Sequence, residues 1–405
     1  MSNENQHIPS GYKPSPLGII PEDWEVKRLG KVGEVFSGGT PNTEIQEYWN
    51  GNIDWCTPTD ITLLNGAVYI ERTAFKITDL GLKSSSAVLL PPNSIIVCTR
   101  ATIGNAAISL HQIATNQGFK NIVPNENIDT LFLYYTIVNN KIRLIRLGNG
   151  STFLEVSKSD FENLTIPVPP LSEQQRIVSV LSLWDTAIEK QTALIEKLTL
   201  RKRGLMQQLL TGKKRLKGFG GEWKEVRLGE IARITMGQSP DSKYYNEIGL
   251  GLPLIQGNAD IQDKKSIQRF WTSSITKTCE GGDIIMSVRA PVGEIAIATQ
   301  KSCIGRGVCA IKNTSIEKKY LYQLLLFEED SWKNIEQGGT FTAINSNEIR
   351  NKAVIIPATD EQNAIASVLV NADKEIEIQK QKLAAMQEQK KGLMQVLLTG
   401  KRRVK

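Results

Sequence analysis

The chain has 405 residues, a formal net charge of +7 and a pI of about 9.0, a length typical of two or three domains. No apolar run reaches the length of a membrane span, and the polar N-terminus is unlike a signal peptide. Five cysteines without close pairing and only two histidines argue against a zinc site, so reduced cysteines in a cytoplasmic protein are expected. The positive charge favours a polyanionic partner, although many basic residues follow helix ends, where they also suit the helix dipole.

The first part of the chain predicts a mixed α/β domain. Residues 1–21 are polar and contain prolines, which predicts an irregular arm. Short apolar runs bounded by turn residues predict strands at 52–56, 87–90 and 94–99. A helix is expected over 130–147. Glycine-containing turns between these elements predict exposed loops that bring the backbone close to a ligand.

Residues 171–213 predict one long helix with a coiled-coil seam. Apolar residues recur with a seven-residue period, which is typical of helix packed on helix. The a positions are Leu181, Ile188, Ile195, Lys202 and Leu209, and the d positions are Ile177, Trp184, Gln191, Leu198 and Leu205. Ser172 is the expected N-cap and Gly212 the expected stop. About 40 helical residues span about 60 Å.

The second part of the chain repeats the first. The string W-x-x-x-R-L-G begins at Trp24 and again at Trp223, and R-A-x-x-G begins at Arg100 and again at Arg289. A strand at 284–288 and a helix at 318–336 match their counterparts in the first part.

Residues 359–404 repeat the long helix without a gap, with Asp360 as the expected N-cap and Gly400 as the stop. Its seam has Leu369, Ile376, Leu383, Lys390 and Leu397 at a, and Ile365, Ala372, Gln379, Met386 and Leu393 at d. The polar seam residues of both copies are interpreted as setting the register.

These elements predict an α+β protein with a pseudo-two-fold internal repeat. Two globular mixed α/β domains, at 1–170 and 214–358, would be separated by a coiled coil of two helices, at 171–213 and 359–405. Because one compact domain joins the end of the first helix to the start of the second, the helices are expected to run antiparallel with a domain at each end. The helices are nearly alike while the domains differ, which indicates a scaffold that holds two different readers.

Catalytic signatures are not found in the sequence. It has no Walker A string, no glycine-rich dinucleotide turn and no Asn/Asp-Pro-Pro-aromatic tetrad, and two histidines leave little room for a His-based triad. The chain is therefore predicted to be non-catalytic and to hold no metal or cofactor. A self-contained nuclease or methyltransferase is the alternative, which activity of the purified single chain would support.

These strings occur in the same order in both parts of the chain. In this arrangement the chain resembles the specificity subunits of type I restriction–modification enzymes. The resemblance covers essentially the whole chain. It also rests on the loop string Asn116-Gln117-Gly118, on the helix entries Glu173-Gln174 and Glu361-Gln362, and on the two helix endings, 204–213 and 392–401. One departure is Gly305-Arg306-Gly307, which stands in the second part where the first has Asn116-Gln117-Gly118.

The resemblance implies two target-recognition domains, each reading one half of a bipartite double-stranded DNA sequence, with the helix pair setting the spacing. It implies that the helices dock two methyltransferase (modification) subunits, which bind S-adenosylmethionine and flip the target adenine. Restriction/translocase subunits using ATP and magnesium would join the complex. This chain would be its non-catalytic, cytoplasmic specificity subunit, with no membrane partner and no cofactor of its own. The alternative is a coiled-coil scaffold for protein interactions without DNA specificity.

The predicted DNA contacts are residues of the glycine-containing loops, because Asn and Gln pair with adenine and Arg with guanine, for about 1–3 kcal/mol of discrimination each. In the first domain they are Gly39, Thr40, Arg100, Asn116, Gln117, Lys120, Ser151 and Thr152. In the second they are Gln238, Ser239, Gln256, Asn258, Arg289, Arg306 and Thr340. Arg100 and Arg289 occur in both domains and cannot by themselves encode different sequences, so they are candidates either for phosphate contact or for holding a turn.

Overall fold

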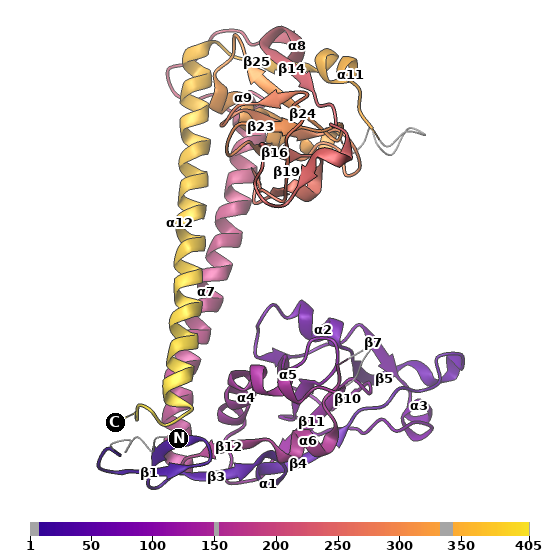
Figure 1. Cartoon of the computed structure of the whole chain (residues 1–405), viewed down its shortest axis with the longest axis vertical. Coiled ribbons are helices and arrows are strands. Elements are labelled where there is room, and N and C mark those ends of the chain that lie inside the picture. The colour runs from indigo at the N-terminus through magenta and orange to yellow at the C-terminus, as the bar shows by residue number, and fades with distance from the viewer. Residues whose placement is uncertain (1–7, 150–153, 333–342, 405) are drawn as a thin grey trace. The chain divides into compact units, whose positions relative to one another are not determined.

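The computed structural model describes residues 8–149, 154–332 and 343–404, and the chain divides into two compact units. One unit comprises Met1–Ala193 and Gln381–Lys405, and the other comprises Leu194–Lys380. Each unit holds a sheet-containing domain and one half of each of two long helices, α7 (Leu171–Leu209) and α12 (Thr359–Leu397) (Figure 1). The predicted class, two mixed α/β domains with a helix pair and an internal repeat, is confirmed.

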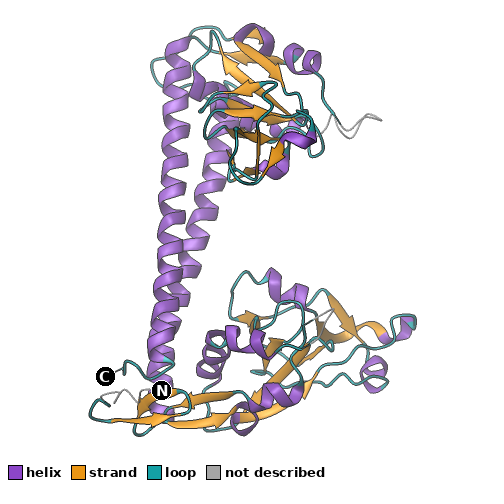
Figure 2. Cartoon of the chain, viewed as in Figure 1, coloured by secondary structure: helices purple, strands orange, loops and turns teal. Residues whose placement is uncertain are grey.

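The domain of the first unit is built on a five-stranded sheet and a three-stranded sheet (Figure 2). Its strands are β3 (Glu25–Arg28), β4 (Gly33–Ser37), β5 (Trp49–Cys56), β6 (Tyr69–Ile70), β7 (Phe75–Ile77), β8 (Ile95–Cys98), β9 (Ala106–Ser109), β10 (Ile113–Thr115), β11 (Phe119–Pro124) and β12 (Thr165–Val168). Its helices are α1 (Leu29–Val32), α2 (Pro58–Leu63), α3 (Asp79–Lys83), α4 (Thr130–Asn139), α5 (Lys141–Leu147) and α6 (Lys158–Asn163). The sheet orders are β4-β11-β8-β9-β6 and β10-β5-β7, and β3 pairs separately with β12.

The second unit repeats this frame. Its strands are β13 (Lys224–Arg227), β14 (Ala232–Met236), β15 (Tyr245–Asn246), β16 (Leu252–Ile255), β17 (Ile261–Gln262), β18 (Lys265–Ser266), β19 (Phe270–Thr272), β20 (Thr278–Cys279), β21 (Ile284–Ser287), β22 (Ile295–Ile297), β23 (Ser302–Ile304), β24 (Val308–Asn313) and β25 (Ala353–Ile356). Its helices are α8 (Leu228–Ile231), α9 (Lys318–Phe327) and α11 (Ser346–Asn351). The order β14-β24-β21-β22 corresponds to β4-β11-β8-β9, and β13 pairs with β25 as β3 pairs with β12.

The long helices are part of each domain's core. In the first unit Leu181 and Leu397 pack in one buried cluster with Val97 of the sheet and Phe132 of α4. In the second unit the equivalent Leu369 and Leu209 join Met286 of the sheet and Leu321 of α9. Every predicted a and d position is buried or half-buried, so the predicted seam is confirmed.

Ion pairs show that the helices run antiparallel within each unit. In the first unit Glu173 pairs with Arg403, and Asp185, further along α7, pairs with Lys390. In the second unit Lys202 pairs with Asp373 at 2.6 Å, and Arg215 with Glu361 at 2.6 Å. Partner numbers fall as α7 numbers rise, which confirms the predicted direction. The polar seam residues Lys202 and Lys390 each meet an aspartate of the other helix.

A buried glutamine near the start of each long helix fixes the adjoining domain. Gln174 accepts a hydrogen bond from Asp129 N at 2.9 Å and donates one to Pro169 O at 2.9 Å. Gln362 does the same with Glu317 N at 3.0 Å and Pro357 O at 2.9 Å. The repeated Glu-Gln string therefore ties the start of a domain helix to the start of a long helix, twice.

The predicted helix caps are wrong by two positions. The carbonyls of Pro170 and Ala358 accept the first helical hydrogen bonds, so Ser172 and Asp360 lie inside the first turn. The predicted stops are confirmed, because Gly212 and Gly400 have φ values of +69° and +71°, the left-handed conformation that ends a helix.

Four other sequence expectations differ from the structure. The irregular arm contains a hairpin, β1 (Tyr12–Ser15) with β2 (Gly18–Pro21), whose prolines stand in a two-stranded edge where their missing N–H is tolerated. The helix expected over 130–147 breaks into α4 and α5 at Asn140, whose side chain binds Thr136 O at 2.8 Å. The run at 87–90 makes only a single bridge, at Leu90. The helix expected at 318–336 ends as α9 at Phe327, and its last positions lie outside the described residues.

All five cysteines are buried and unpaired. Burial raises the pKa of Cys98 and of Cys279 to about 11, and that of Cys309 to about 12. These three thiols are therefore protonated at neutral pH and poor nucleophiles. Among the described helices, none is both long enough and apolar enough to cross a membrane.

Candidate nucleic-acid interface

Two predicted loops of the first unit lie against each other. The loop after β4 begins with Gly38, where an added Cβ would stand 1.9 Å from Asn116 O, so only glycine permits this approach. Gly39 is buried and donates from its N–H to Thr115 O at 2.9 Å. The Thr40 hydroxyl donates to Gln117 Oε1. Thr40, Asn116 and Gln117 thus form one cluster.

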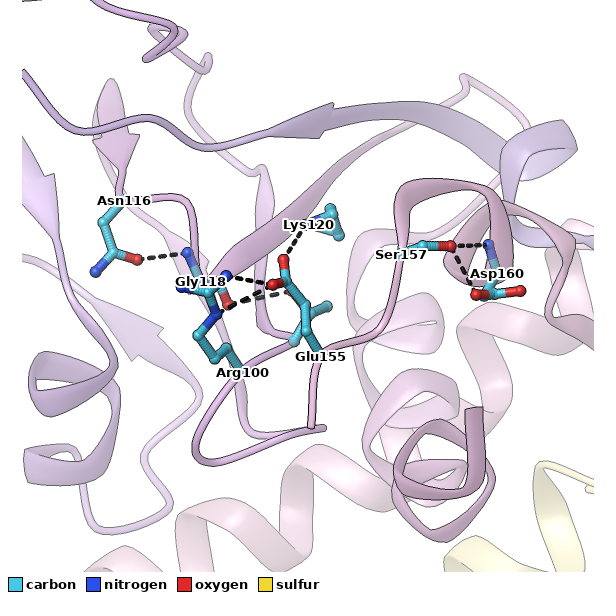
Figure 3. A network of polar contacts seen from close by, with 8 residues as sticks. Arg100, Asn116, Gly118, Lys120, Glu155, Ser157 and Asp160 are labelled. Atoms are coloured by element: carbon cyan, nitrogen blue, oxygen red, sulfur yellow. Dashed lines mark hydrogen bonds and ion pairs between the residues drawn. The ribbon is translucent and has the colours of Figure 1, made fainter. Parts of the chain in front are cut away.

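Asn116 holds the loop between β10 and β11. Its Oδ1 accepts a hydrogen bond from Gly118 N at 2.9 Å, which closes a tight turn (Figure 3). Asn116 is half-buried and Gln117 is exposed. The turn therefore presents an exposed amide beside a half-buried one, the side-chain chemistry that reads adenine edges.

A charged network lies next to this turn. Arg100, just after β8, donates to Glu155 Oε2 from Nε at 3.1 Å and also from Nη2, while Lys120 donates to Glu155 Oε1 at 3.3 Å (Figure 3). Lys120 is only 6% exposed, and its ammonium faces the carboxylate. Lys120 therefore holds Glu155 in place, and its contact with DNA stays a prediction. Glu155 was not among the predicted residues.

The second unit gathers its predicted residues in the same way. An added Cβ at Gly237 would stand 2.2 Å from Gly305 O, as at Gly38. Ser239 Oγ accepts from Arg306 N at 3.1 Å, and the Gln238 carbonyl accepts from the Thr276 hydroxyl. Gln238 and Arg306 are exposed, while Ser239 is half-buried.

The remaining residues of the second cluster are placed by backbone contacts. An added Cβ at Gly307 would stand 2.0 Å from Gln256 O, which puts Gln256 beside the turn that contains Arg306. Val288 N donates to Gly307 O at 2.9 Å, so the exposed Arg289 follows directly. Asn258 Oδ1 is buried and accepts no hydrogen bond from the described residues. The predicted Ser151, Thr152 and Thr340 lie outside the described residues.

Each cluster offers amide, hydroxyl and guanidinium groups at loop ends of a rigid sheet frame. These groups suit hydrogen bonds to base edges and phosphates. Across residues 8–149, 154–332 and 343–404, no group of three or more His, Cys, Asp or Glu side chains is arranged to hold a metal ion.

The internal repeat matches a known family twice. The model of the "Type I restriction modification DNA specificity domain" matches residues 21–200 and again residues 220–388. The chain belongs to this family. It is a specificity subunit of a type I restriction–modification system, and the match favours DNA specificity over the scaffold alternative.

Two relatives of this chain are themselves named as specificity subunits. The putative MjaX specificity subunit of Methanocaldococcus jannaschii is 29% identical and covers 97% of this chain and 97% of its own length. The MjaIX specificity subunit of the same organism is 35% identical over 58% of each chain. A solved structure from work on assembly and conformational transition of the type I R-M system has a TM-score of 0.62 and 27% identity, covering 95% of this chain and 99% of that one.

Replacing Gly38 by alanine in this specificity subunit should lower the free energy of unfolding by about 1–3 kcal/mol, because the new Cβ overlaps the backbone of the Asn116 turn. DNA affinity should fall as well, since the two loops separate. Chemical unfolding and a DNA titration measure both effects. Gly392→Ala is the matched control in the same unit: nothing lies within 4 Å of its added Cβ, so it should be neutral or slightly stabilising. Equal behaviour of the two variants would contradict the loop contact.

Proposed function

We propose that each unit of this specificity subunit reads one half of a bipartite double-stranded DNA target, and that the helix pair sets the spacing of the half-sites. The main support is that one backbone frame occurs twice with different side chains at its loop ends. Where the first unit has Asn116, Gln117 and Gly118, the second has Gly305, Arg306 and Gly307. Different donors on the same frame would read different bases, so the target would be asymmetric.

Gln117, Gln238 and Arg306 are our strongest candidates for base contact, because they are the exposed polar residues of the two clusters whose counterparts differ between the units. Thr40, Asn116, Ser239, Gln256 and Asn258 are half-buried beside them and would shape the same surface. Arg100 and Arg289 stand at matching places in both units and would bind phosphate, which positions the DNA without reading it.

The long helices would dock two modification subunits. Large apolar side chains face solvent on them: Leu183 and Leu200 of α7 are each 70% exposed, and Ile378 of α12 is 60% exposed. Such residues suit burial against a protein partner. The partner subunits would supply S-adenosylmethionine for adenine methylation, and restriction/translocase subunits would supply the chemistry that uses ATP and magnesium. The whole complex would act in the cytoplasm, with this chain as its non-catalytic part.

Exchange of one domain tests the bipartite target. Residues 30–164, which lie between the paired strands β3 and β12, are replaced by those of a relative with a different motif. Methylation-sensitive sequencing of a host carrying this chain and its modification subunits should then show a new first half-site with the second half-site and spacer unchanged. Exchange of residues 229–352, between β13 and β25, is the matched control and should change only the other half-site. An unchanged motif in an assembled complex would refute the proposal.

A salt titration separates DNA binding from a pure protein scaffold. Phosphate contacts release counterions, so the logarithm of affinity should fall with the logarithm of salt by about 0.9 per contact. Affinity for duplex DNA that does not change with salt would argue against phosphate contacts.

A further inference from the structure

Arg100 and Arg289 occupy matching places in the two units but have different neighbours. Arg100 forms a backbone bridge to Glu155, and Arg289 forms the same bridge to Ala343. The next hydrogen bonds also match, because Val156 N donates to Thr99 O at 3.0 Å and Ile344 N donates to Val288 O at 2.9 Å. The backbone is thus the same, but the second unit has a methyl group where the first has a carboxylate.

The residue that matches the buried Lys120 also differs between the two units. Lys120 pairs with Ser37 between β11 and β4, and Cys309 occupies the equivalent place opposite Met236 between β24 and β14. The first unit therefore has three charged residues at these places, Arg100, Lys120 and Glu155. At the matching places the second unit has one charged residue, Arg289, with Cys309 and Ala343. Within the part of the chain that the structure describes, no side-chain hydrogen bond or ion pair involves the exposed Arg289.

The charge on Glu155 is stable at neutral pH. Burial opposes ionisation, but the hydrogen bonds and charges of Arg100 and Lys120 outweigh it and hold the pKa of Glu155 below its ordinary value. Lys120 is buried and keeps the carboxylate in place, while Arg100 is 43% exposed at its side chain. The Arg100 side chain is thus partly exposed, while its Nε and Nη2 already donate to the Glu155 carboxylate, an anion that competes with any phosphate for this guanidinium.

We propose that Glu155 makes the phosphate contact of Arg100 conditional on a close fit, and so acts as a specificity-determining residue of the first unit. Loosely docked, non-cognate DNA does not displace the carboxylate, whereas closely docked cognate DNA does. Among the residues that the structure describes, Arg289 has no such competitor, and it contacts phosphate on either DNA. This rests on the proposed function of the arginines as phosphate ligands.

The test measures binding of the assembled complex to cognate and non-cognate duplexes over a salt series, with the cognate motif taken from methylation sequencing. Glu155→Gln should tighten non-cognate binding about two- to fivefold, the range of a partly exposed ion pair. Its salt slope on non-cognate DNA should steepen by about 0.9, one added phosphate contact, while the slope on cognate DNA stays the same. The ratio of cognate to non-cognate affinity should fall.

Two further variants guard against a folding defect. The single change Glu155→Gln leaves the buried Lys120 ammonium without a counter-charge. The double variant Lys120→Met, Glu155→Gln removes that ammonium and places an apolar residue where the second unit has Cys309. It should give the same binding result as Glu155→Gln. Ala343→Glu is the reciprocal change. Ala343 is exposed, so a carboxylate has room there, and it should weaken non-cognate binding and flatten the slope by about 0.9.

The outcomes distinguish the inference from the function beneath it. Adding Arg100→Ala to Glu155→Gln should abolish the gain, because the competition acts through Arg100. Unchanged non-cognate affinity and slope in Glu155→Gln would overturn the inference while leaving DNA binding intact. Weaker cognate binding with unchanged non-cognate binding would also overturn it, since Glu155 would then itself contact a base. Absence of salt-dependent DNA binding in the unaltered complex would overturn the proposed function as well.

Discussion

Replacing Arg403 by methionine should lower the free energy of unfolding of the specificity subunit by about 3 kcal/mol, because it leaves a buried carboxylate without its counter-charge. The Glu173 side chain is 1% exposed and receives hydrogen bonds from Arg403 Nε at 3.1 Å and Nη2 at 2.6 Å. We expect the low end of the range for broken buried pairs, because Arg403 is itself 37% exposed and Trp24 Nε1 still donates to Glu173 at 3.0 Å. Urea unfolding followed by circular dichroism measures the change.

The neighbouring Arg402 is the matched control. It is exposed, and only its backbone N–H is bonded to the helix, at Val396 O. Arg402→Met removes the same charge and should change stability by less than about 0.5 kcal/mol. Arg215→Met, the equivalent change in the second unit, should destabilise in the same direction, because Glu361 is 3% exposed. If Arg402→Met and Arg403→Met lower the free energy of unfolding equally, the change in net charge causes the destabilisation. The broken ion pair with Glu173 is then not its cause.

Replacing Lys390 by methionine should cost about 2–3 kcal/mol, because it leaves Asp185 in the helix seam without a cation. Lys390 and Asp185 are 16% and 23% exposed, and the Tyr135 hydroxyl of α4 also donates to Asp185. The Lys390 ammonium lies 4.9 Å from the centre of the Tyr135 ring. One aspartate therefore joins α7, α12 and the domain helix.

The combined variant Tyr135→Phe, Asp185→Leu and Lys390→Met should recover most of that stability. It removes every polar member of the group at once, so no charge or hydroxyl is left buried without a partner. Thermal or urea unfolding of both variants shows whether the loss comes from the unpaired charge of Asp185 or from altered packing. A combined variant as unstable as Lys390→Met alone would mean that packing, and not the stranded charge, causes the loss.

The helix pair could be predicted because its signal is periodic and local. Leu181 and Leu369 each begin a series of seam positions seven residues apart, and both are buried. The predicted caps lie two positions too late, because Pro170 and Ala358 cap through their carbonyls, which any residue supplies, so side-chain preference gives no signal. The hairpin at Tyr12–Pro21 was missed because its prolines resemble those of an unstructured arm.

The loop clusters could be predicted in part for a related reason. Turns such as Asn116-Gln117-Gly118 are visible as strings, and the repeat shows which strings occupy matching places. Glu155 was not predictable, because it meets Arg100 across fifty-five residues of chain and has no counterpart in the second unit. Lys120 resembles any basic residue near a loop, and only the fold shows that the first four residues of β11, Lys120 among them, are buried on both faces of the strand.

The ion pairs of the two helix ends have an evolutionary consequence. Glu173 with Arg403 and Glu361 with Arg215 are the same contact made twice, as are Asp185 with Lys390 and Asp373 with Lys202. All eight partners lie on or just after the long helices, and the two copies carry the same residue at each of these matching positions. A crossover inside one of these helices, between two genes that both encode these pairs, would therefore exchange an entire recognition domain and leave each pair with an equivalent partner. Under the proposed function, such an exchange would change one half-site in a single recombination step while the ion pairs of the helices are kept.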